Sequence, residues 1–157
     1  MELENLEIYQ ISMVISEKIW EITKTWPYFE KDTIGKQIVR SADSISANIS
    51  EGFGRYHYND SRNFLFFARG SLYETLTWLK KARDRNLIKN EEFEHLQKQC
   101  LRLTVKLNNF IKTIGKRVNQ WHHNNLMTTL WPPSHLSHLI TFLTLSPLSP
   151  LSPYPLP

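Results

Sequence analysis

The sequence lacks most of what a disulfide-stabilised, secreted or membrane-spanning protein needs. Cys100 is the single cysteine among 157 residues, so no disulfide can form within the chain. The acidic segment 1–7 has neither the positive charge nor the unbroken apolar stretch of a secretory signal. The most apolar segment, 126–145, is interrupted by prolines and histidines, whereas a spanning helix needs about 20 predominantly apolar residues. We therefore expect a cytoplasmic protein with no membrane partner.

Charge is absent from the last 40 residues. All 19 Lys and Arg and all 15 Asp and Glu lie in residues 1–117. Residues 118–157 instead hold seven of the eight prolines and end in Leu-Ser-Pro repeats, a composition that favours extended conformations. We therefore predict a folded domain, residues 1–117, which is long enough to bury a core, and a disordered Leu/Ser/Pro/His tail, residues 118–157.

The charged domain shows helical periodicity in four segments and no sustained strand alternation. Pro27 is expected to end the first helix, and Asp32 or Thr33 to cap the second. Asn90 is a good cap for the fourth, whose apolar residues repeat at intervals of three and four. The helices are expected at about 3–25, 32–52, 59–82 and 90–114. Their short connections predict an all-α, antiparallel up-down-up-down four-helix bundle.

The apolar residues form a single seam in the fourth predicted helix and two stripes in the third. In the fourth helix the apolar seam is Phe93, Leu96, Cys100, Leu103, Leu107, Phe110 and Ile114. In the third helix there are two stripes, one of Phe64, Ala68, Ser71, Thr75, Trp78 and Ala82, and one of Leu65, Leu72, Leu76 and Leu79. The tryptophans Trp20, Trp26 and Trp78 are expected in the core or in an interface.

A polar stripe follows the second helix, and small residues accompany it. Gly70 in the third helix suggests a close approach of another backbone, because glycine costs up to about 1 kcal/mol inside a helix. A close approach would bury Arg40, for which Glu74 is the natural partner. We therefore predict a structural polar clasp made of Gln37, Arg40, Ser44, Asn48, Glu51, Ser71 and Glu74. A functional site is the alternative, but no histidine, cysteine or obvious nucleophile joins the stripe.

The runs 35–52 and 64–74 resemble a bacterial four-helix-bundle family. The pattern in order is Gln, Arg, Ser-Ile, Ala-Asn-Ile and Glu-Gly, then Ala-x-Gly-Ser-Leu-x-Glu. The founding members are encoded by intervening sequences within large-subunit (23S) ribosomal RNA genes, and accessory variability proteins of retroelements form a related branch. The resemblance implies a homo-oligomeric ring, commonly a pentamer, without established enzymatic activity. The related branch implies a basic surface that engages RNA, DNA or a nucleic-acid-processing protein.

Basic residues gather on the back of the fourth helix and at the end of the third. The first group is Lys98, Arg102, Lys106, Lys112 and Lys116, and the second includes Lys80, Lys81 and Arg83. Such surfaces can hold phosphates through nonspecific contacts. The helix dipole also favours cations near helix C-termini, so part of the clustering needs no ligand. Leu101 and Val105 share the outer side of the fourth helix, which favours a subunit contact there.

Catalytic patterns are weak. Glu92-Phe-Glu-His95 occurs once, whereas a di-iron bundle needs two such motifs. Arg117 and His122 match the short Arg-x4-His motif of HEPN-type ribonucleases, but at the edge of the uncharged tail. We therefore expect no enzyme, cofactor or metal site. The predicted function is a noncatalytic homo-oligomeric bundle that binds nucleic acid or a partner that processes it, and the alternative is a protein-interaction scaffold.

Overall fold

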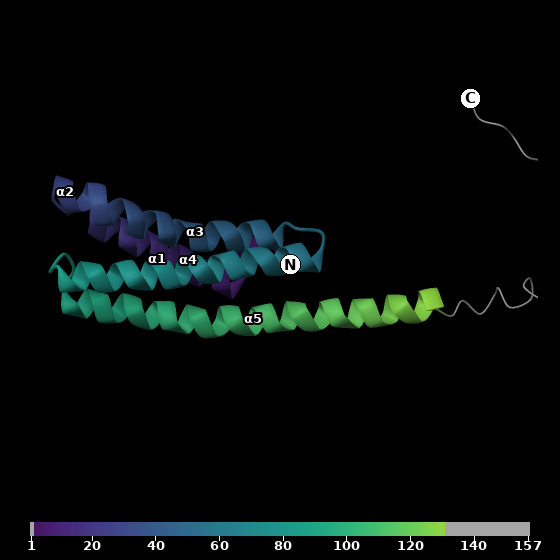
Figure 1. Cartoon of the computed structure of the whole chain (residues 1–157). Coiled ribbons are helices and arrows are strands. Elements are labelled where there is room, and N and C mark those ends of the chain that lie inside the picture. The colour runs from purple at the N-terminus through teal and green to yellow at the C-terminus, as the bar shows by residue number, and fades with distance from the viewer. Residues whose placement is uncertain (1, 131–157) are drawn as a thin grey trace, which may run out of the picture. The chain divides into compact units, whose positions relative to one another are not determined.

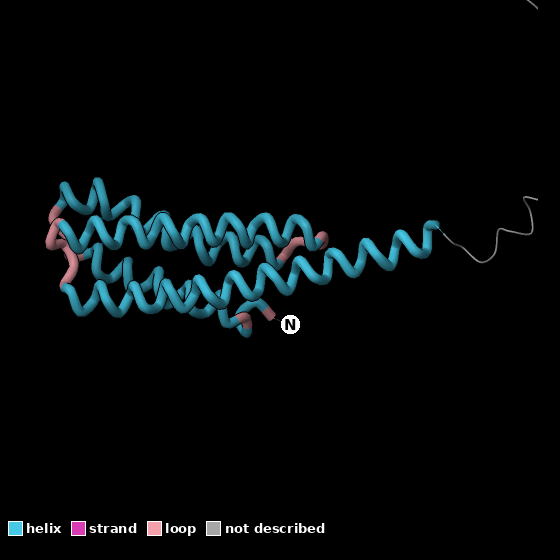
Figure 2. The backbone as a smooth tube through the Cα atoms, turned by 60° about the horizontal axis from the view of Figure 1, so that its bottom comes forward, coloured by secondary structure: helices cyan, strands magenta, loops and turns pink. Residues whose placement is uncertain are grey.

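Helices make up most of the described chain. The structure, a computed structural model, describes the backbone of residues 2–130 and the side chains of residues 2–114. The elements are η1 (Leu3–Asn5), α1 (Glu7–Lys24), α2 (Tyr28–Glu30), the π-helical turn η2 (Lys31–Gly35), α3 (Lys36–Phe53), α4 (Tyr58–Asp84) and α5 (Asn90–Leu130). Figures 1 and 2 show α1, α3, α4 and α5 side by side, with short connections at their ends. The predicted all-α four-helix bundle is confirmed.

The order of the helices around the bundle follows from their contacts, all of which lie within the compact unit Met1–Gln120. Between α3 and α4, Ser41 contacts Thr75. Gly52, which lies later in α3, contacts Ser61, which lies earlier in α4. The other neighbours also pair in opposite sequence order: Arg69 with Asn108 and Arg83 with Phe93 between α4 and α5, and Glu7 with Arg102 and Lys18 with Glu92 between α1 and α5. Since α1 also packs on α3, the helices follow one another around the bundle.

The core is a single cluster of aliphatic side chains from all four long helices. The predicted seam of α5 is confirmed, because its members from Phe93 to Leu107 are buried, and Ile111 is buried beside the half-buried Phe110. The two stripes predicted for α4 are wrong. One buried stripe takes residues from both sets, and the remaining apolar residues flank it: Leu65, Ala68, Leu72, Thr75, Leu79 and Ala82 are buried. This spacing of three and four is the ordinary core pattern of a bundle helix.

Helix α5 begins at Asn90 as predicted and α4 within one residue of the predicted start, whereas α3 is preceded by helix that the sequence did not predict. Thr33 does not cap α3, because the chain is already helical from Tyr28 through η2, and the Thr33 hydroxyl donates a hydrogen bond to the Phe29 carbonyl oxygen at 2.7 Å. Ser61 lies inside α4, which begins at Tyr58, and its hydroxyl donates to the Gly52 carbonyl oxygen at 2.6 Å. Both hydroxyls therefore satisfy carbonyl groups rather than the free N–H groups of a helix start.

Helix α5 continues past the predicted end of the folded domain. It runs from Asn90 to Leu130, although Gly115 and the change of composition at Val118 favoured an earlier end. An interior glycine weakens a helix but does not stop it, and no proline occurs between Pro27 and Pro132. The predicted disorder of the tail beyond Leu130 lies outside the described residues. Among the described helices, none is long and apolar enough to cross a membrane.

Two glycines give opposite expectations for substitution by alanine. A Cβ at Gly52 would lie 3.0 Å from the Ser61 carbonyl oxygen and 3.1 Å from the Phe64 Cβ, so the close packing of α3 on α4 requires glycine here. At Gly70 no described atom lies within 4 Å of the added Cβ, so the predicted close approach of another backbone does not occur among the described residues. Among the described residues, no packing contact therefore compensates for the helix-propensity cost of Gly70.

Gly52→Ala is expected to lower the free energy of unfolding by about 1–2 kcal/mol, because overpacking outweighs the gain in helix propensity. Gly70→Ala is the matched control and is expected to raise it by about 0.5–1 kcal/mol. Urea unfolding followed by circular dichroism at one protein concentration measures both. Equal stability of the Gly52→Ala variant and the original chain would contradict the packing described for α3 and α4.

Candidate interaction surfaces

The predicted Arg40–Glu74 clasp does not form within the chain. Both side chains are exposed, and no described carboxylate lies within ion-pair distance of Arg40. Glu74 Oε1 instead accepts a hydrogen bond from Trp78 Nε1 at 3.2 Å, within α4. A buried polar contact between the helices is instead made by the next residue of α3, since the Thr75 hydroxyl donates to Ser41 Oγ at 3.1 Å. Arg40 lies about 100° away from Ser41 around the helix and points toward the α1 side.

The rest of the polar stripe is satisfied within single helices. The Ser44 hydroxyl donates to the Arg40 carbonyl oxygen at 2.7 Å, and Asn48 Nδ2 donates to the Ser44 carbonyl oxygen at 2.7 Å. In α4 the Ser71 hydroxyl donates to the Phe67 carbonyl oxygen at 3.1 Å. Glu51 forms an ion pair with Arg55, and Gln37 is exposed. The predicted clasp residues therefore form no network between the helices, and the buried link at this level is made by Ser41 and Thr75 instead.

The cations on the back of α5 divide into paired and unpaired ones. Arg102 Nη2 lies 3.0 Å from Glu7 Oε1, and Lys106 Nζ lies 2.8 Å from Glu7 Oε2. The hydrogen bond from Lys106 is the main reason that the pKa of Glu7 is lowered, and Arg102 lowers it further. Lys98 and Lys112 are exposed and pair with no described carboxylate. The structure thus keeps part of the predicted basic face accessible, while the side chain of Lys116 lies outside the described residues.

The second basic cluster, at the end of α4, is tied to aromatic rings. The Lys81 ammonium lies 4.3 Å from the centre of the Trp78 ring. The Arg83 guanidinium pairs with Asp84 at 2.8 Å and lies 4.5 Å from the centre of the buried Phe93 ring. Lys80 is exposed. Arg83 therefore helps to join α4 to α5, and Lys80 and Lys81 are the more accessible cations of this cluster.

Exposed apolar side chains form a strip on the outer side of α4 and α5, and the residues on α4 were not predicted from the sequence. It consists of Phe66, Tyr73, Leu101 and Val105, which are 37%, 53%, 53% and 61% exposed. Arg69 Nη1 donates to Asn108 Oδ1 at 3.2 Å and so fixes the register of the two helices. The interval of seven between the two α4 aromatics was the available signal, since such residues share a helix face. We call these four residues the α4–α5 strip.

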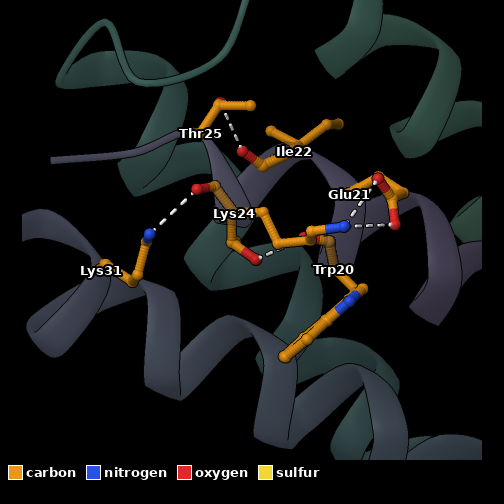
Figure 3. A network of polar contacts seen from close by, with 7 residues as sticks. Trp20, Glu21, Ile22, Lys24, Thr25 and Lys31 are labelled. Atoms are coloured by element: carbon orange, nitrogen blue, oxygen red, sulfur yellow. Dashed lines mark hydrogen bonds and ion pairs between the residues drawn. The ribbon is translucent and has the colours of Figure 1, made fainter. Parts of the chain in front are cut away.

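A groove of about 520 Å³ lies between the end of α1 and the start of α3. Trp20, expected in a core or an interface, lines this groove and is 50% exposed, whereas Trp26 is buried. Figure 3 shows the α1 end, where Lys31 Nζ donates to the Lys24 carbonyl oxygen at 2.9 Å. The pKa of Asp43, on the α3 wall, is raised by desolvation and by the negative charge of Glu17. We call this feature the Trp20 groove.

Comparisons with known proteins agree with the fold. The family model described as 23S rRNA-intervening sequence protein matches residues 4–109. A solved structure from Bacteroides thetaiotaomicron, described as a protein of unknown function from the S23 ribosomal protein family, is similar with a TM-score of 0.61 and 26% identity, over 67% of this chain and 98% of that one. No curated protein matches. Because the family match spans more than half of the sequence, the chain belongs to the 23S rRNA-intervening sequence protein family.

Proposed function

We propose that this chain is a noncatalytic, cytoplasmic bundle that assembles with copies of itself and binds nucleic acid on its cationic surfaces. The observation that carries the assembly is the α4–α5 strip, because four large apolar side chains lie exposed along two neighbouring helices. Large apolar side chains that lie exposed on neighbouring helices are typical of protein interfaces. A closed ring, with five copies as the expected number from the family resemblance, would bury the strip in every copy.

The strip has the surroundings of a subunit interface. Its centre is apolar, and Arg69, Asn108, Lys98 and Lys112 provide polar groups on the same two helices. A polar rim around an apolar centre is the common arrangement in oligomers. The Arg69 guanidinium also lies 5.0 Å from the centre of the Phe66 ring, so part of the strip is held in one conformation before any partner arrives.

A net positive charge, part of it on exposed and unpaired lysines, supports nucleic-acid binding. The net charge is +4, and Lys98 and Lys112 are exposed without a described ion-pair partner. Arg102 and Lys106 share the single carboxylate of Glu7 in pairs that are exposed to solvent and therefore screened. A phosphate group can displace such a carboxylate. The surface therefore suits sequence-independent contacts with a phosphate backbone.

The test is a titration of fluorescent single-stranded RNA and of duplex DNA with the intact chain at two salt concentrations, with the mass recorded by light scattering. We expect micromolar or tighter binding by an assembled species. For RNA the log-log slope against salt should be about 0.7 per phosphate contact, as is usual for single strands. Absence of binding at low salt by an intact assembly would contradict the nucleic-acid part of the proposal.

A protein-interaction scaffold is the second candidate function, and a separate observation favours it. Exposed aromatic side chains surround the connection between α3 and α4: Phe53, Tyr56, Tyr58 and Phe67 are 38%, 92%, 43% and 59% exposed. Aromatic residues are enriched in protein interfaces. An assembled chain that binds neither RNA nor DNA at low salt would favour this second candidate function.

A further inference from the structure

The Trp20 groove combines an aromatic surface with clustered cations. Its α1 wall carries Trp20 and Lys24, and its other wall carries Lys31, Lys36 and Arg40 from η2 and α3. A volume of about 520 Å³ falls in the range of roughly 300–1,000 Å³ that is usual for ligand pockets. We propose that this groove binds one base of a single-stranded nucleic acid on Trp20 and the neighbouring phosphates on these cations. The inference rests on the proposed nucleic-acid function and adds a binding site between α1 and α3 to the cationic surface of α5.

Trp20 suits a stacking role because its side chain is half exposed on the wall of the groove. The other wall of the groove includes Gly35, which has no side chain, and Val39. Stacking of a base on an aromatic ring contributes about 1–3 kcal/mol and tolerates every base. An exposed tryptophan that leaves room beside its ring therefore fits a base better than it fits the core.

The cations of the groove are available to phosphate. No described carboxylate pairs with Arg40, and Lys24 and Lys36 pair with the exposed Glu21 and Asp32, in contacts that solvent screens. Lys36 and Arg40 lie one helical turn apart, about 6 Å along the axis, so they can contact more than one phosphate. This spread favours a strand over a single phosphate group.

The two ends of the groove differ in charge. Lys24, Lys31 and Lys36 lie at one end, and Asp43 lies about two turns further along α3, near Glu17. A carboxylate repels phosphate, but it accepts hydrogen bonds from the amino groups of cytosine, adenine or guanine. The groove therefore has a phosphate end and a base end, with Trp20 and Arg40 between them.

Assembly through the α4–α5 strip would leave the groove open. Since α1 packs on α3, α3 on α4, α4 on α5 and α5 on α1, the edge between α1 and α3 lies opposite the edge between α4 and α5. Figure 1 shows α4 between α3 and α5. Each copy in an assembly could therefore present its own groove to a strand.

The test uses the intact chain and a fluorescein-labelled strand of 12 cytidine nucleotides, compared with a strand of the same length without bases. Trp20→Ala is expected to weaken binding of the cytidine strand about tenfold, within the range of roughly 5- to 150-fold that loss of one stacked base corresponds to. Trp20→Phe should keep most of the affinity. On the strand without bases, Trp20→Ala should change nothing, which separates stacking from a general loss of structure.

Arg40→Gln tests the phosphate contacts of the groove, and Lys98→Gln removes the same charge from the other proposed binding surface, on α5. We expect Arg40→Gln to weaken binding of both strands more than Lys98→Gln does. If Lys98→Gln weakens binding while both groove variants bind like the original chain, the groove is not the binding site, and the proposed nucleic-acid function is retained. If the original chain binds no strand at all, both fail.

Two further outcomes would overturn the inference. A lower mass of the Trp20→Ala variant in light scattering would make Trp20 a subunit contact. Competition by free cytidine monophosphate at micromolar concentration would make the groove a mononucleotide site, because a strand site should gain from several phosphates. We expect an unchanged mass and competition only at far higher concentration.

Discussion

Val105→Asp is expected to convert the assembled protein into single chains at micromolar concentration. Val105 is 61% exposed at the centre of the α4–α5 strip, so aspartate is tolerated in the free chain. In an assembly the same carboxylate would be buried without a partner, which costs several kcal/mol. Size-exclusion chromatography with light scattering should therefore show a fall to the single-chain mass of 18.6 kDa.

Val14→Asp is the matched control for this experiment. Val14 is 62% exposed on α1, away from the strip, so the change in charge and the loss of helix propensity are the same. We expect the control to keep the mass of the original assembly. If both variants assemble like the original chain, the strip is not the subunit interface. If Val14→Asp alone dissociates it, the interface lies on α1.

Cys100 is expected to react with a thiol reagent at least about a thousandfold more slowly in the folded chain than in the unfolded chain. The side chain is completely buried, and desolvation raises the pKa of its thiol to about 12 from an ordinary value of 9.0. Three pKa units correspond to about a thousandfold less thiolate, which is the reactive form. Labelling with Ellman's reagent at pH 8, with and without guanidinium, measures the ratio.

The same shift predicts how stability depends on pH. Folding favours the neutral thiol, so the contribution of Cys100 is fully present below pH 9, the ordinary pKa, and is lost as the pH rises from 9 toward 12. Cys100→Ala should remove this part of the pH dependence, although it should also lower stability at neutral pH by leaving a small cavity. Rapid labelling of the folded chain would contradict the packing of the α5 seam.

The sequence predicted the elements better than their contacts. The seam from Phe93 to Ile114 was predictable because a repeat of three and four residues places side chains on one face whatever the neighbours are. The start of α3 was not, because a favourable cap such as Thr33 competes with helix already formed before it. The end of α5 was missed because composition, rather than a proline, was used to place it.

The errors in the candidate sites have one physical cause. A helical period gives the faces of a helix but not which neighbour each face meets, and one residue changes the direction by about 100°. Ser41 therefore contacts Thr75 where Arg40 was expected to contact Glu74. For the same reason the sequence could not decide between a core and an interface position for Trp20, which lies half exposed in a groove and so outside the core.

The proposal that an assembled bundle holds nucleic acid is tested by sedimentation velocity of the unmodified chain with a labelled 12-nucleotide single-stranded RNA, recorded at the absorbance of the label. The proposal predicts that the label sediments with a species several times heavier than the 18.6 kDa chain, and that added salt releases the label before it dissociates the assembly. Sedimentation of the label by itself, or with a single chain, would contradict the proposal that an assembled bundle holds nucleic acid.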